Sequence, residues 1–369
     1  MAKLGDVCNK AASNIAQKDL IGREGPYPIY GASGFITNVD FYQQENPYIA
    51  VVKDGAGVGR VIKLPAKSSV IGTMQYIIPH ENIDVSYLAY AMENMNLGRY
   101  YTGATIPHIY FKDYQKEELP IPSLDEQRRI AAVLDKVTDL IAQRRAQLDK
   151  LDLLVKSRFV EMFGDPEVNS FKLPSIPMTN LCEIIDGDRG PNYPKQEEFS
   201  SDGYCLFLNA KNVTNSGFCF NQCLYISKEK DSLMRKGKLQ RGDIVLTTRG
   251  TIGNLAFYDN TIPYENVRIN SGMVILRVHK EQITEIFFIE QFKMLLDLIK
   301  SKMASGSAQP QLPISTMKQI MMLVPPIEKQ MEFNKIVAQT NTFKSSITSS
   351  LDLLETLKKT LMQQYFESR

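Results

Sequence analysis

The stretch LPIPSLDEQRRIAAVLDKVTDLIAQRRAQLDKLDLLVKSRFVEMFG, Leu119 to Gly164, predicts one long amphipathic helix near the middle of the chain. Its apolar residues recur in steps of three and four, as a helix with one buried stripe requires. Ser123 or Asp125 can cap the start, and Gly164 with Pro166 ends the helix. The helix therefore runs about forty residues, roughly 60 Å at 1.5 Å per residue. The stripe consists of Ile130, Val133, Leu134, Val137, Leu140, Ile141, Leu148, Leu151, Leu154 and Val155.

A second copy of this helix lies at Leu323 to Ser368, shifted by 203 positions without a gap, so that Gln127 falls on Gln330. The match extends upstream, where the loop GATIPHI at 103–109 falls on GSAQPQL at 306–312. Any two amphipathic helices can align by leucine alone, but such an alignment does not account for the shared loop glycine and proline. The repeat therefore indicates an internal duplication, and each helix supplies a partner for the other's apolar stripe.

The composition is that of an ordinary globular chain, with 369 residues, 43% hydrophobic and 23% charged, which is enough for two or three domains. No apolar run approaches twenty residues and the first residues lack a signal-peptide core, so we expect a cytoplasmic protein. Five cysteines without paired spacing favour reduced thiols, and no metal site is expected from Cys219 and Cys223 alone. With a net charge of +2, any nucleic-acid-binding surface must be local.

Two globular segments alternate with the two helices. In the first, short apolar segments at 48–52, 60–64 and 75–79 predict strands separated by glycine and proline turns, and 86–96 predicts a helix. In the second, residues 242–258 predict a strand, a glycine turn and a strand, and a helix follows. We therefore predict an α/β (α+β) fold of two lobes with pseudo-twofold repetition. The predicted domains are 1–118, 119–164, 165–322 and 323–369.

The glycine-rich segment GAGVG at 55–59 raises the alternative of a dinucleotide-binding loop. A strand-like segment, RVIKL, follows it, where a phosphate-binding turn must open a helix. We therefore interpret the segment as a glycine-permitted turn between strands.

The order of variable domain, EQ-type helix, variable domain and second helix, with a G-x-x-x-P loop before each helix, resembles the specificity subunit of a type I DNA restriction-modification system. The resemblance covers essentially the whole chain. It implies two target-recognition domains that read the halves of a split, asymmetric double-stranded DNA sequence, with the two helices packed antiparallel as a coiled-coil spacer between them. It further implies a chain without catalytic residues or a bound cofactor of its own.

The partners implied by this resemblance are two modification subunits and the restriction subunits. S-adenosylmethionine would be bound by the modification subunits for adenine methylation, and ATP and Mg would serve the restriction subunits in cleavage. The second helix departs from the first where Lys329 replaces Glu126 and Met331 replaces Arg128, so its subunit contacts need not be the same. The candidates for contact with partner subunits are Glu126, Gln127, Arg128, Arg129 and Gln330.

Base edges are read by hydrogen bonds from polar side chains, and lysine or arginine elsewhere contacts phosphate. Loop residues of these types occur in both globular segments, although any one of them can equally be a solvated surface residue. The first-domain candidates are Thr73, Gln75, Thr105, His108, Tyr110 and Lys112. The second-domain candidates are Arg189, Lys195, Arg249, Arg268, Asn270, Gln309 and Gln311.

Two other functions remain as alternatives. An intrinsic DNA methyltransferase would need an N-P-P-Y-type turn, and Asn46-Pro47-Tyr48 lacks the second proline; no G-x-G opens a helix and no P-loop occurs. A coiled-coil scaffold without DNA reading would explain the helices, but not two dissimilar domains rich in polar loop residues.

The helix contains no proline or glycine between Arg128 and Phe163. We therefore predict that its length sets the spacing between the two DNA half-sites. Inserting four residues after Arg145 adds roughly 6 Å at 1.5 Å per residue, against about 3.4 Å per base pair. We expect the half-sites to separate by one or two base pairs, with weaker binding and unchanged half-site letters. The methylated motif of cells carrying the insertion measures this; an active variant that keeps the original gap would show that the helix does not set the spacing.

Overall fold

The computed structural model describes residues 1–103, 107–303 and 312–367. The chain forms two compact units, unit 1 (Met1–Gln147 with Ile347–Arg369) and unit 2 (Leu148–Ser346). Each unit contains one globular domain, the first part of the long helix that follows it and the last part of the other long helix. The boundaries predicted at residues 118, 164 and 322 lie just outside the long helices, whereas the division into units falls within each of them.

The two long helices are α3 (Leu124–Phe163) and α7 (Ile327–Phe366), each of 40 residues. The shift of 203 positions carries both ends of α3 onto both ends of α7. At the start of α3, the carbonyl of Ser123 accepts a hydrogen bond from the nitrogen of Gln127 at 2.9 Å. At its end, Gly164 has φ +75° and its nitrogen donates to the carbonyl of Val160 at 2.8 Å. The predicted helix and its start and stop signals are confirmed.

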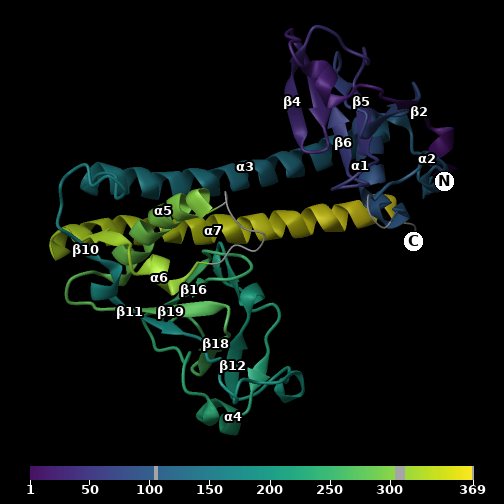
Figure 1. The fold of residues 1–369 in the computed structure, drawn as a ribbon. Helices are drawn as coiled ribbons and strands as arrows, with labels where there is room; N and C mark the ends of the chain where they lie inside the picture. The colour runs from purple at the N-terminus through teal and green to yellow at the C-terminus, as the bar shows by residue number, and fades with distance from the viewer. Residues whose placement is uncertain (104–106, 304–311, 368–369) are drawn as a thin grey trace. The chain divides into compact units, whose positions relative to one another are not determined.

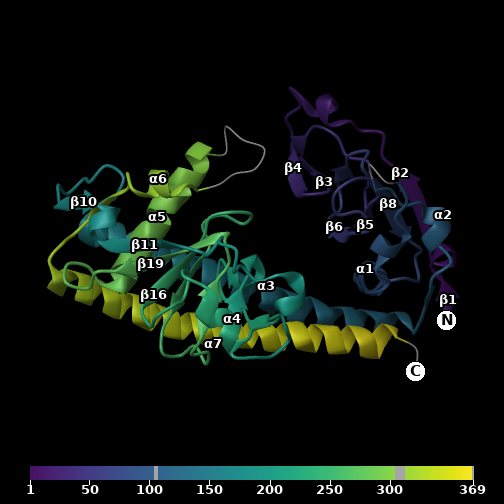
Figure 2. The ribbon, with the colours of Figure 1, turned by 60° about the horizontal axis from the view of Figure 1, so that its bottom comes forward.

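Within each unit, the portions of α3 and α7 lie side by side and antiparallel (Figure 1, Figure 2). In unit 1, Arg145 pairs with Glu355 at 2.7 Å, and Leu134 lies in one buried cluster with Met362. In unit 2, Lys344 pairs with Asp152, and the rings of Phe159 and Phe333 lie 5.5 Å apart. Residue numbers rise along α3 as they fall along α7, which is the predicted antiparallel arrangement.

The buried stripe of α3 differs from the prediction in its second part. Ile130, Leu134, Val137, Ile141 and Val155 are buried as expected, but Leu154 is 44% exposed. The stripe continues instead through two aromatic residues that pack on the helix α5 (Glu285–Met303), because a step of four from position 155 keeps the same helix face. These residues are Phe159 and Phe163.

Unit 1 contains a four-stranded sheet in the order β2-β8-β5-β6 and a three-stranded sheet in the order β4-β3-β7, and β1 pairs with β9. Its strands are β1 (Ala2–Lys3), β2 (Cys8–Ala12), β3 (Tyr27–Gly31), β4 (Gly34–Val39), β5 (Tyr48–Val52), β6 (Val61–Leu64), β7 (Ser69–Val70), β8 (Met74–Pro79) and β9 (Glu118–Leu119). Its short helices are α1 (Val85–Asn94) and α2 (Phe111–Tyr114).

Unit 2 contains the corresponding sheets β11-β19-β16-β17 and β15-β12-β18, and the pairs β10-β20 and β13-β14. Its strands are β10 (Ser175–Pro177), β11 (Cys182–Asp186), β12 (Cys205–Leu208), β13 (Val213–Thr214), β14 (Gly217–Phe218), β15 (Tyr225–Ile226), β16 (Asp243–Thr247), β17 (Leu255–Tyr258), β18 (Val267–Ile269), β19 (Met273–Val278) and β20 (Met321–Leu323). Its helices are α4 (Lys228–Leu233), α5 (Glu285–Met303) and α6 (Ile314–Met317).

The two globular domains share strand order and register. Ile49 pairs with Ile77 between β5 and β8, as Ile244 pairs with Leu276 between β16 and β19. The parallel pair β3-β7 recurs as β12-β18. The mixed α/β class and the internal repetition are therefore confirmed.

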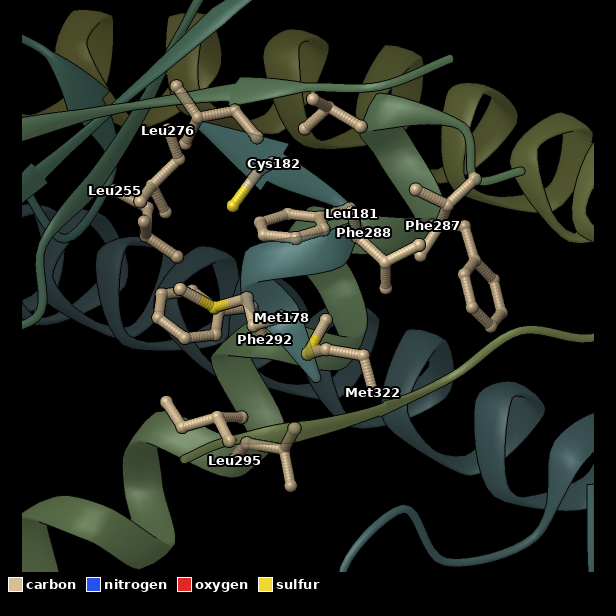
Figure 3. Packing of buried hydrophobic residues seen from close by; sticks show 14 of the residues in the cluster. Met178, Leu181, Cys182, Leu255, Leu276, Phe287, Phe288, Phe292, Leu295 and Met322 are labelled. Carbon is tan, nitrogen blue, oxygen red and sulfur yellow. The ribbon is translucent and has the colours of Figure 1, made fainter. Parts of the chain in front are cut away.

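The core of unit 2 gathers side chains from the sheet and from α5 and the long helices. Figure 3 shows Phe288 and Phe292 of α5 among the same buried residues as Met178 and Leu181. The described helices include none with the length and apolar character needed to cross a membrane.

The glycine segment at 55–59 is the turn between β5 and β6, as interpreted from the sequence. Gly59 has φ +85°, and a Cβ there would lie 2.3 Å from the nitrogen of Gly98. The glycine is required by this close approach of two backbones, and no helix opens after it.

A buried glutamine connects each long helix to its globular domain. Oε1 of Gln127 accepts from the nitrogen of Asp84, the cap of α1, at 2.9 Å, and Nε2 donates to carbonyls of Asn82 and Pro122. Gln330 repeats these contacts with Thr284, Gln282 and Pro325. The two side chains are 1% and 0% exposed, so each amide is bonded inside its own unit.

We expect Gln127→Ala to lower the free energy of unfolding by about 1–3 kcal/mol, because it leaves the partly buried nitrogen of Asp84 without its acceptor. Chemical denaturation measures this change. Gln143→Ala, at an exposed position of the same helix, is the matched control and should change it by less than about 0.5 kcal/mol. If the two substitutions changed the free energy of unfolding equally, the buried amide of Gln127 would not stabilise the contact between helix and domain.

Candidate nucleic-acid interface

In unit 1, three loop segments meet at the end of β5. The nitrogens of Lys53 and Asp54 both donate to the carbonyl of Thr73, at 3.0 and 3.3 Å. The nitrogen of Ile109 donates to the carbonyl of Lys53 at 3.0 Å, so the duplicated loop returns to the same place. Thr73 is exposed here.

His108 lies in this cluster through its contact with Asp54, where Nδ1 of the imidazole meets Oδ1 of the carboxylate. Its ring centroid is 4.2 Å from that of Tyr110, and Nζ of Lys112 lies 5.1 Å from the centroid of Tyr110. Four predicted residues are therefore brought together at one edge, Thr73, His108, Tyr110 and Lys112. Thr105 lies outside the described residues.

Gln75 was predicted as a loop residue, and the structure corrects this. It lies on β8, is 3% exposed, and its amide nitrogen donates to the hydroxyl of Tyr114. Alternation along β8 places Gln75 on the face toward Tyr114 of α2, and residues on both faces of this part of the strand are buried. Its amide is used inside the domain and is not presented to a base.

In unit 2, the equivalent loops meet at the turn 270–272. The nitrogens of Thr248 and Arg249 donate to the carbonyl of Gly272 at 2.9 and 3.2 Å, and Oδ1 of Asn270 accepts from the nitrogen of Gly272 at 2.9 Å. Nη2 of Arg189 donates to the carbonyl of Ser271 at 3.3 Å. Arg189, Arg249 and Asn270 therefore share one edge. Gln309 and Gln311 lie outside the described residues.

Two further cations join this edge that the sequence reasoning missed. The buried carboxylate of Asp188 accepts from the nitrogens of Gly190 and Arg235, both at 2.7 Å, and so connects the loop at 188–190 to the loop at 234–237. Burial raises the pKa of Asp188, but these backbone hydrogen bonds outweigh it and leave the pKa below its usual range. Arg235 and Lys236 are exposed beside it. In the sequence, these two cations could have been found as a pair of adjacent basic residues directly before Gly237.

Lys195 is exposed, and its backbone nitrogen donates to the carboxylate of Glu198 at 2.7 Å. No described contact connects it to the turn 270–272.

Arg268 was predicted as a DNA-reading loop residue, and this is also corrected. It lies on β18, is 5% exposed, and its Nε donates to the buried carboxylate of Asp231 at 2.5 Å. Its remaining nitrogens donate to carbonyls of Asp231, Met234 and Lys236. The guanidinium therefore holds the loop after α4 against the sheet.

We expect Asp231→Ala to lower the free energy of unfolding by about 3–5 kcal/mol, because it leaves the Arg268 charge buried without its carboxylate. Burial raises the pKa of Asp231, but hydrogen bonds from Lys238 and Arg268 outweigh it and hold the pKa low. The ion pair between Asp231 and Arg268 should therefore contribute its full stabilisation above the unfolded-state pKa of aspartate, about 3.9. This stabilisation is lost as the pH falls through the lower pKa that Asp231 has in the folded state.

Urea denaturation across this acidic range measures both effects, with exposed Lys236→Ala as the control. A variant at position 231 as stable as the control at neutral pH would contradict the role given to the pair.

The predicted partner contacts divide into two groups. Arg128 and Arg129 are exposed and Glu126 is half-buried, and Arg129 donates to both carboxylate oxygens of Glu126, at 2.7 and 2.5 Å. The hydrogen bond from Arg129 lowers the pKa of Glu126. Gln127 and Gln330 are buried with both ends of the amide bonded inside their own units. These two residues position the domains and do not present a surface to a partner.

Residues 1–151 and 176–357 match the family model of the type I restriction modification DNA specificity domain. These ranges cover most of the chain, which therefore belongs to this family.

The chain is 25% identical over 352 residues to the specificity subunit of the type I restriction enzyme MjaVIII of Methanocaldococcus jannaschii, covering 89% of this chain and 80% of that protein. It is 22% identical over 277 residues to the EcoBI specificity subunit of Escherichia coli, covering 68% and 57%. A crystal structure of the S subunit of a type I restriction-modification system from M. genitalium matches with a TM-score of 0.59 and 19% identity, covering 100% and 96% of the two chains. At that identity the likeness is one of fold.

Proposed function

We propose that this chain is the cytoplasmic DNA-recognition subunit of a type I restriction-modification complex and reads a split, asymmetric sequence. The observation that carries the proposal is the pair of domains with one strand order and register but unlike loop edges. Two domains that share a fold but carry different loop residues at the binding edge would bind two different half-sites. Since the chain belongs to the specificity family, its sites serve recognition, while methylation and cleavage are reactions of partner subunits.

The chemistry of the two edges supports DNA as the ligand. Unit 2 gathers Arg189, Arg235, Lys236 and Arg249 around the turn 270–272, a local positive surface on a chain whose net charge is only +2. Such clusters contact phosphate and, through arginine, base edges. Unit 1 presents a more mixed edge. We therefore expect the two half-sites to differ in sequence.

The partner surfaces proposed for the modification subunits lie on the long helices. Arg128 and Arg129, which are exposed, form a charged patch at the start of α3 together with the half-buried Glu126. In unit 1, Leu353 and Leu357 of α7 are 71% and 45% exposed, an uncovered apolar face that a protein partner would bury. In that complex the modification subunits would hold S-adenosylmethionine, and the restriction subunits would use ATP and Mg.

The alternatives receive less support. The glycine turn at 55–59 joins two strands, so it does not form the helix-opening cofactor loop of a methyltransferase. A scaffold without DNA reading would not account for the gathering of four cations at one loop edge of unit 2.

The test is domain exchange. Replacing residues 3–118 with the equivalent segment of a relative should change one half-site and leave the other unchanged, because each domain forms its own sheets and loop edge. Modification-sensitive sequencing of host DNA, with the parent subunit as control, reads both half-sites. An assembled hybrid that alters both halves, or a parent that methylates one uninterrupted or palindromic site, would refute the two-reader proposal.

A further inference from the structure

Asp54 and Arg249 occupy the same position of the shared domain fold. Each is the second residue after its strand, β5 or β16. The nitrogen of Asp54 donates to Thr73 at 3.3 Å, and the nitrogen of Arg249 donates to Gly272 at 3.2 Å. The acceptors are themselves equivalent, since each directly precedes β8 or β19.

The neighbouring backbone bonds repeat as well. The carbonyl of Lys53 accepts from Ile109, and the carbonyl of Thr248 accepts from Leu312, both at 3.0 Å. Ile109 and Leu312 are related by the same 203 positions as the long helices. The backbone at this position is therefore conserved between the domains, while the side chains have opposite charge.

In unit 2, the guanidinium of Arg249 is exposed and has no hydrogen-bond partner in the described part of the chain. Its backbone is held by the bond to Gly272, so the side chain extends from a fixed turn. A planar guanidinium has the donor geometry to bind O6 and N7 of guanine together. Because no intramolecular bond has to be broken, it can donate to DNA at low cost.

In unit 1, the carboxylate of Asp54 is already engaged. Oδ1 contacts Nδ1 of His108, and Oδ2 lies 3.6 Å from Nζ of Lys53. Nε2 of His108 has no hydrogen-bond partner among the described residues. When Nδ1 donates to the carboxylate, Nε2 of the neutral ring is an acceptor. An acceptor selects the exocyclic amine of adenine or cytosine in the major groove.

We propose that this position determines specificity in both domains: Arg249 reads a guanine in the half-site of unit 2, and Asp54 positions His108 to read an adenine or cytosine amine in the half-site of unit 1. The inference rests on the proposed function and deepens it by naming the reading residues. The opposite charges would make the two edges select opposite hydrogen-bonding patterns.

The test for unit 2 uses the subunit assembled with its modification partners and competition binding against duplexes with each base pair substituted in turn. Arg249→Ala should reduce discrimination at one guanine of one half-site by roughly five- to 150-fold, with the other pairs unchanged. Arg249→Lys keeps the charge but removes the bidentate fork, so it should lose the same discrimination while binding to random DNA stays near the parent value.

Arg235→Ala is the matched control, since it removes one exposed cation from the same edge. It should weaken binding to site and random DNA alike. If Arg249→Ala does only the same, Arg249 contacts phosphate and the inference is overturned.

The test for unit 1 uses Asp54→Asn, His108→Ala and the double variant. Both single variants should relax discrimination at the same base pair of the other half-site, and the double variant should lose no more than His108→Ala, because Asp54 acts through His108. Additive losses, or losses at different pairs, would overturn the positioning role. Thermal unfolding of each variant separates these outcomes from misfolding.

The parent complex distinguishes the two levels of the proposal. If it binds all sequences equally, the proposed function fails. If it is selective and the variants keep its selectivity, only the present inference fails.

Discussion

The antiparallel seam between portions of α3 and α7 is the interaction on which each unit depends. A helix of this length with a single apolar stripe obtains most of its stability from packing that stripe, and each unit buries it against the other long helix. The domain is then attached through Gln127 or Gln330, whose buried amide joins the helix start to the cap of α1 or α5. The packing between the two long helices and the buried glutamine amide together hold each globular domain at a fixed place on its own portion of helix.

Duplication explains why the two domains can differ at their edges without differing in fold. Strand pairing and register depend on alternating inward residues, and a slip of one residue would turn every side chain to the wrong face. The interior is therefore constrained, and both domains keep the same ladder between β5 and β8 and between β16 and β19. Loop residues beyond the strand ends carry no such constraint. Asp54 and Arg249 have diverged to opposite charges on one backbone frame.

Charge alone is a poor guide to which of these residues face a ligand. Arg189 and Arg268 are both arginines near the same turn, yet one is exposed and the other is enclosed by Asp231 and three carbonyls. An arginine on a strand can serve the packing of a loop as well as the binding of phosphate. The burial and bonding of the guanidinium distinguish the two roles.

The sequence by itself determined the long helices, their ends and their duplication, because a period of three to four apolar residues and terminal signals such as Ser123 and Gly164 act locally. It also determined the strands around the glycine turn at 55–59 and the family resemblance. Only the tertiary structure decided that Gln75, Gln127, Arg268 and Gln330 are buried, and that Arg235 joins Arg189 at one edge. Most hydrogen-bond partners of these buried side chains lie in segments distant along the chain, and no local spacing encodes which segments will meet.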